Sequence, residues 1–110
     1  MSLAKDMTDR IINLMQFARK AGKLTGGTDA CLRALHGRGL YLLVIAGDTA
    51  ERTTKKLVNA TEESGRRIKI IRLGTKVGIS TALGLPFTGV FGILDKQFAA
   101  KMLEYYAAQQ

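Results

Sequence analysis

Apolar and polar residues alternate along this chain with the periods expected of helices and strands. The first predicted helix begins at Thr8, whose side chain can cap it, and ends at Gly22. Shorter helical patterns of apolar residues end at Gly37 and Gly65, and a third ends before Pro86. These further helices are predicted to start near Gly27, Asp48, Lys76 and Asp95.

Apolar segments with strand character lie between the predicted helices. The run from Leu40 to Ala46 is unbroken, which is typical of a central strand covered on both faces. Residues 68–73 and 88–94 predict two more strands, and residues 23–25 predict a short one. Helices and strands therefore alternate along the chain.

This alternation implies crossover connections between neighbouring strands. We expect an α/β fold in which a mixed, partly parallel sheet of four strands lies between helical layers, a three-layer α/β/α sandwich. Neither a linker nor an internal repeat divides the chain. Residues 1–110 are therefore expected to form one domain, with residues 1–7 as a flexible N-terminus.

The balance of charge indicates a polyanionic partner. The 110 residues include 17 Lys and Arg against 9 Asp and Glu, a formal net charge of +8, and 46% of residues are hydrophobic. Such a chain can fold and can attract nucleic acid, because clustered positive charge displaces counterions from phosphates. A single cysteine, and the lack of a signal-like or membrane-length apolar run, favour a cytoplasmic protein that does not bind membranes.

The junction Gly26-Gly27-Thr28 leads directly into the second predicted helix. A glycine pair at a helix start leaves backbone N–H groups bare, which suits a phosphate, and the basic Arg33 follows within the helix. The Gly-Lys-Ser/Thr ending of an ATP-binding P-loop is missing. The junction therefore favours a nucleic-acid backbone over ATP.

Residues suited to catalysis or metal binding are scarce. His36 and Cys31 are the only residues of their types, and a spacing of five does not place them on one helix face. Capping explains the acidic residues near the predicted helix starts, namely Asp29, Asp48, Glu51 and Asp95. We expect no catalytic residue, no metal and no cofactor, and an enzyme acting on a phosphate ligand is a distant third possibility.

Four groups of motifs occur in a characteristic order: 19–24 (RKAGKL) followed by 27–35, then 46–57, 75–84 and 95–101. Together they resemble the ribosomal-protein family of L-seven-Ae and L-thirty-e, which binds RNA kink-turns, and in particular its bacterial YlxQ-like branch. The resemblance covers nearly the whole chain from Ile11 to Leu103.

This resemblance implies an RNA site made by two neighbouring loops. In the family, the turn into the second helix contacts sheared G·A pairs and phosphates of a bent RNA, while an apolar second loop covers an extruded nucleotide. The resemblance assigns to the first turn Gly26, Gly27, Thr28, Asp29, Ala30 and Arg33. It assigns to the second loop Leu85, Pro86 and Phe87, and Lys23 and Lys76 can add phosphate contacts.

Some of these assignments have structural alternatives. Phe87 either packs on an unstacked base or enters the core ahead of the strand at 88–94. Arg33 either engages a phosphate or a guanine edge, or is a solvated helix residue. The chain also departs from the family, because Asp29-Ala30 stands where kink-turn readers carry Asn-Glu, which weakens base readout.

The preferred hypothesis is a non-catalytic RNA-binding protein, expected to be a monomer and linked to translation or ribosome assembly. Its partners would be structured RNA of the kink-turn type and components of the ribosome or its assembly. The alternative is a protein–protein adaptor on the same fold, with the basic face meeting an acidic partner.

Overall fold

Five helices and four strands follow one another in the computed structural model, which describes residues 3–37 and 39–109. In chain order they are α1 (Leu3–Lys20), β1 (Leu24–Gly26), α2 (Thr28–His36), β2 (Leu42–Ala46), α3 (Glu51–Glu63), β3 (Lys69–Leu73), α4 (Lys76–Leu83), β4 (Val90–Ile93) and α5 (Lys96–Ala108). Each element predicted from the apolar pattern is present, with ends that differ by a few residues.

The four strands form one mixed sheet in the order β1-β4-β2-β3. Strands β2 and β3 are parallel, with Leu42 opposite Lys69 and Ala46 opposite Leu73. Strand β4 runs antiparallel to both β1 and β2. The mixed four-stranded sheet predicted from the sequence is confirmed.

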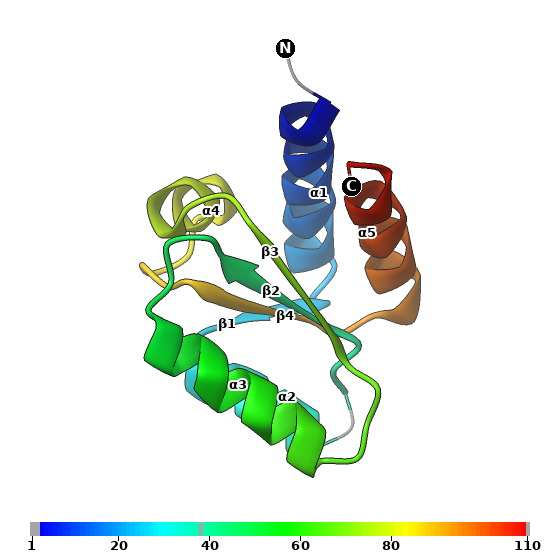
Figure 1. Cartoon of the computed structure of the whole chain (residues 1–110). Coiled ribbons are helices and arrows are strands. Elements are labelled where there is room, and N and C mark those ends of the chain that lie inside the picture. The colour runs from blue at the N-terminus through cyan, green and yellow to red at the C-terminus, as the bar shows by residue number, and fades with distance from the viewer. Residues whose placement is uncertain (1–2, 38, 110) are drawn as a thin grey trace.

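Helices cover both faces of this sheet (Figure 1). Helices α1, α4 and α5 lie on one face, and α2 and α3 lie on the other. All five residues of β2 are buried. Val44 and the β2 residues two positions before and after it face the layer of α1, α4 and α5. Leu43 and Ile45 face the layer of α2 and α3, so β2 contributes to both halves of the core. None of the described helices combines the length and apolar character needed to cross a membrane.

Helix α1 begins earlier than the sequence predicted. It starts at Leu3, so Thr8 lies inside the helix, and the prediction that Thr8 caps it is wrong. Residues 3–7, expected as part of a flexible N-terminus, form its first turns, while residues 1 and 2 lie outside the described residues. The apolar face extends back to Met7, which is buried one turn before Ile11.

The capping prediction for Asp48 is also wrong. Helix α3 has Ala50 at its N-cap position, with no side-chain cap bond. The Asp48 carboxylate instead accepts a hydrogen bond from the backbone N–H of Lys76, at 2.9 Å, in the first turn of α4. Parallel pairing of β2 and β3 brings these two turns together, and Gly47 N–H donates to the Gly74 carbonyl at 2.9 Å.

Asp29 and Glu51 lie in the first turns of α2 and α3, where a negative charge suits the helix dipole, but neither helix has a side-chain cap bond, so capping does not explain these two residues. The predicted cap at Asp95 is confirmed. The Asp95 carboxylate accepts from the N–H of Phe98 at 2.9 Å, at the start of α5. This bond satisfies one of the backbone donors that a helix start leaves unpaired.

Candidate nucleic-acid interface

The junction after β1 and the loop after α4 lie side by side. They enclose a hollow of about 250 Å³ lined by Gly26, Gly27, Leu85, Pro86, Phe87 and Thr88. The Gly27 N–H donates to the Val90 carbonyl at 2.8 Å, which holds the junction against the start of β4. A Cβ atom on Gly26 would lie 3.2 Å from Cδ1 of Leu85, so the two segments are in close contact.

Gly27 sets the geometry of the first turn. Its φ of 98° lies in the region that only glycine adopts readily, although a Cβ atom there would meet nothing within 4 Å. The first backbone bond that closes α2 runs from the Cys31 N–H to the Gly27 carbonyl, at 3.0 Å. The N–H groups of residues 28–30 therefore have no acceptor within the helix, and they carry the positive end of its dipole.

Ser80 fastens the second loop at its base. Its buried hydroxyl donates to the Thr88 carbonyl at 3.0 Å and accepts from the Thr88 N–H at 3.1 Å. Gly84 ends α4 in the left-handed conformation, with φ of 65°, and the Leu85 N–H donates to the Ser80 carbonyl at 3.0 Å. The sequence shows Ile79-Ser80 where the family carries Leu-Gly, a difference expected to alter packing alone, and the hydrogen bonds of Ser80 to Thr88 were not predicted.

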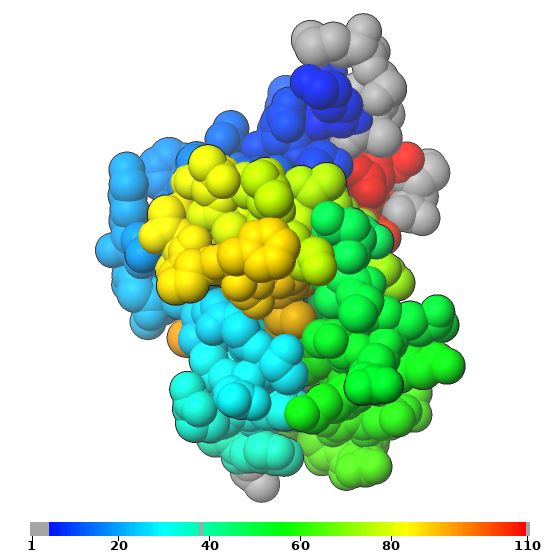
Figure 2. All heavy atoms as spheres, turned by 90° about the vertical axis from the view of Figure 1, so that its left-hand side faces the viewer, coloured from blue at the N-terminus to red at the C-terminus, as the bar shows by residue number. Residues whose placement is uncertain are grey.

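Phe87 projects from this loop into solvent. Its side chain is 64% exposed, so the alternative in which it enters the core does not occur. The Lys76 ammonium lies 5.3 Å from the centroid of its ring, within the range of a cation–π contact. Figure 2 shows the 84–87 loop, in yellow to orange, above the start of α2 in cyan and beside the start of α3 in green.

Lys76 is placed by its contacts with the turn before β4. A Cβ atom on Gly89 would lie 2.9 Å from Cγ of Lys76 and would collide with Oγ1 of Thr49. The aliphatic part of the Lys76 side chain therefore packs directly against Gly89. The Gly89 carbonyl accepts from the Thr49 hydroxyl at 3.2 Å and from the Ala46 N–H at 2.8 Å. Thr49 and Gly89 were absent from the site predicted from the sequence, because their role depends on contacts between distant segments.

The remaining predicted site residues divide into two groups. Asp29 and Arg33 are exposed one turn apart on α2, and in the described part of the chain no ion pair joins them. Thr28 and Ala30 are half-buried beside them. Lys23 is not brought into the hollow, because it lies before the opposite end of β1, where its carbonyl accepts from the Leu94 N–H.

The two residues considered for metal or nucleophile chemistry lie apart from this surface. Cys31 is 1% exposed, and burial raises the pKa of its thiol to about 12. His36 is exposed at the other end of α2. Among the described residues, no group of three His, Cys, Asp or Glu side chains is placed to hold a metal ion.

The hollow between the Gly27 junction and the 84–87 loop lies within a part of the sequence that matches a known protein family. The model of the "Ribosomal protein L7Ae/L30e/S12e/Gadd45 family" matches residues 9–103. The chain belongs to this family. No curated protein sequence matches the chain.

Solved structures share the L7Ae-like fold at low sequence identity. A protein of unknown function from Bacillus halodurans superposes with a TM-score of 0.80 at 22% identity, over 88% of this chain and 96% of that one. The Giardia lamblia 15.5kD RNA binding protein superposes with a TM-score of 0.75 at 19% identity, over 96% of this chain and 91% of that one. The resemblance noted in the sequence is confirmed at the level of family and fold.

Proposed function

We propose that this L7Ae-family protein is a non-catalytic RNA-binding protein that recognises a kink-turn or a similarly bent RNA, in the cytoplasm, in translation or ribosome assembly. Membership of a ribosomal-protein family supports an RNA partner, and so does the fold shared with a protein described as RNA-binding. The net charge of +8 provides the electrostatic attraction that any RNA ligand requires.

The observation that carries this proposal is the meeting of two chemically different turns in one hollow. The start of α2 offers unpaired N–H groups for a phosphate, with Arg33 one helical turn beyond Asp29. The second loop offers the exposed ring of Phe87, on which an unstacked base can lie. A bent RNA presents a phosphate backbone and an extruded base close together, whereas a regular duplex keeps its bases stacked inside.

Equilibrium binding to two RNAs tests the proposal. We expect tighter binding to a kink-turn RNA than to a plain duplex of equal length, with a log–log salt dependence of about −0.7 to −0.9 per phosphate contacted. Equal affinity for the two RNAs would contradict recognition of bent RNA. Failure to bind either RNA would favour the protein–protein adaptor.

A further inference from the structure

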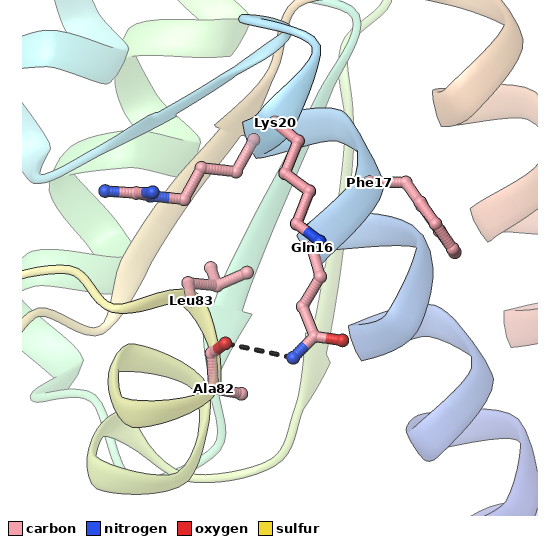
Figure 3. A pocket seen from close by; sticks show the side chains of 6 residues that line it. Gln16, Phe17, Lys20, Ala82 and Leu83 are labelled. Atoms are coloured by element: carbon pink, nitrogen blue, oxygen red, sulfur yellow. Dashed lines mark hydrogen bonds between the residues drawn. The ribbon is translucent and has the colours of Figure 1, made fainter.

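A second cleft lies beside the 84–87 loop, between the last turn of α1 and the end of α4. It has a volume of about 200 Å³ and is lined by Gln16, Phe17, Arg19, Lys20, Ala82 and Leu83. Figure 3 shows Gln16 and Lys20 on the side of α1 that faces Ala82 and Leu83, while Phe17 points away from them. In Figure 2 the end of α1, in light blue, adjoins the yellow segment of the 84–87 loop.

Two hydrogen bonds connect this cleft to the base of the loop. The Gln16 side-chain amide donates to the Ala82 carbonyl at 3.0 Å, and the Arg19 guanidinium donates to the Gly84 carbonyl at 3.5 Å. These carbonyls belong to the end of α4, where backbone acceptors lack partners within the helix. Arg19 is exposed and carries five N–H donors, so a contact to Gly84 leaves others available for a ligand.

The charge and shape of the cleft favour a nucleic-acid strand. Arg19 and Lys20 are both exposed at its rim, and Ala82 and Leu83 supply an apolar floor. None of the described residues that line it carries a negative charge. A guanidinium can hold a phosphate through two parallel hydrogen bonds, and a lysine adds a point charge.

From this continuity with the loop, and resting on the proposed function, we infer that the α1–α4 cleft binds the RNA strand that flanks the nucleotide held at Phe87. Arg19 and Lys20 contact phosphates of that strand, and the floor of the cleft packs against its sugar or base. The interface thus covers both sides of the 84–87 loop, with the hollow at Gly27 on one side and this cleft on the other.

Charge-neutralising variants test the inference with a kink-turn RNA as the probe. Lys20→Gln is the main variant, because Lys20 has no hydrogen bond to the loop among the described residues. Arg19→Gln/Lys20→Gln removes both cations. The matched control is Arg67→Gln/Lys69→Gln, which removes the same charge just before and at the start of β3, the edge strand farthest from β1 in the sheet. Thermal unfolding checks that every variant is folded.

We expect the double variant to bind the kink-turn RNA about tenfold more weakly than the wild type, since hydrogen bonds to charged groups contribute at least this much. Lys20→Gln should make the salt dependence of binding less steep, by the amount that corresponds to about one phosphate contact. Phosphate-ethylation interference should show one or two sites, next to the extruded nucleotide, that weaken binding of the wild type but not of the double variant. The control should keep the wild-type interference pattern.

The inference is overturned if the double variant binds within twofold of the control, or if its interference pattern equals that of the wild type. Both results leave the proposed function standing, provided that the wild type prefers the kink-turn RNA to the duplex. If the wild type itself shows no such preference, the proposed function has failed first. An effect of the double variant on plain duplex as large as on the kink-turn RNA would also overturn the inference, because it would reflect general attraction.

Discussion

The exposure of the Phe87 side chain depends on the residue at which strand β4 begins. The Ser80 hydroxyl binds both backbone groups of Thr88, and β4 starts only at Val90, so Phe87 remains outside the sheet. Val90 and Phe91 are the residues that enter the core. The exposed ring lines the hollow beside Gly27 and contacts Lys76.

Replacing this ring should weaken RNA binding. We expect Phe87→Ala to cost about 1 to 3 kcal/mol of binding free energy, because a stacked base loses its aromatic partner. Phe87→Tyr should keep most of the affinity, since it preserves the π-face. Tyr41→Ala is the control, because Tyr41 is an exposed aromatic near Ile93, at the opposite end of β4. The measurement is the dissociation constant for a kink-turn RNA, and an equal rise for Phe87→Ala and Tyr41→Ala would contradict a stacking role.

The pair Asp29-Ala30 should limit base readout. Asp29 is exposed beside unpaired helix N–H groups, and its negative charge opposes a phosphate at the same place. We expect Asp29→Asn together with Ala30→Glu to strengthen binding to a kink-turn RNA and to leave plain duplex little changed. Competition between the two RNAs measures the change in preference. An unaltered preference would remove these two positions from the readout.

The buried thiol of Cys31 makes a prediction about pH. Burial raises its pKa from 9.0 to about 12, so between these values the unfolded chain loses the proton while the folded chain keeps it. This thiol therefore leaves stability unaffected below pH 9 and lowers the free energy of unfolding as the pH rises above 9. Urea unfolding at pH 7 and pH 10 should show a larger fall for the wild type than for Cys31→Ala. Equal falls would contradict the assignment.

At the scale of elements, the turn before β4 should tolerate no added side chain. Gly89 is buried beneath Thr49 and the Lys76 stem, and a Cβ atom would collide with both. We expect Gly89→Ala to destabilise the protein by about 1 to 3 kcal/mol, the usual cost of overpacking. Gly39→Ala is the control, because a Cβ atom there meets nothing within 4 Å and no positive φ constrains it. Denaturant midpoints compare the two variants.

The helices and strands could be predicted because each one depends mainly on its own apolar pattern. Burial on both faces of β2 follows from an unbroken apolar run, and the Asp95 cap follows from local spacing. Asp48 was misassigned because capping rules consider only the residues that follow along the chain, whereas its partner is Lys76 on another helix. The position of a hydrogen-bonding partner across the fold is not encoded in local periodicity.

The candidate site was predictable only in part for the same reason. The family resemblance identified the two turns, and the structure places Gly27 beside the 85–88 segment. The exposure of Phe87 could not be decided, because it depends on the bonds between Ser80 and Thr88. Lys23 follows the first helix closely in sequence, yet the direction of β1 carries it away from the hollow.

For the whole molecule, a specific RNA should act as a stabilising ligand. A kink-turn RNA at a free concentration of 100 times its dissociation constant should add about 2.7 kcal/mol to the free energy of unfolding. For a chain of this size, that raises the melting temperature by roughly 10 °C. Thermal melts with kink-turn RNA and with plain duplex at equal concentration provide the measurement. Identical shifts would indicate charge attraction without recognition.

Strand β4 lies between β1 and β2, so the loop that precedes it leads into the interior of the sheet. Residues 85–87 follow Gly84, which ends α4, and precede Thr88, whose backbone N–H and carbonyl are both hydrogen-bonded to the Ser80 hydroxyl, so the framework fixes both ends of this segment. The loop can therefore be exchanged as a cassette of constant length while the sheet beneath it stays unaltered. If the loop binds an unpaired nucleotide as proposed, a library of such cassettes should yield proteins of one scaffold that select different nucleotides.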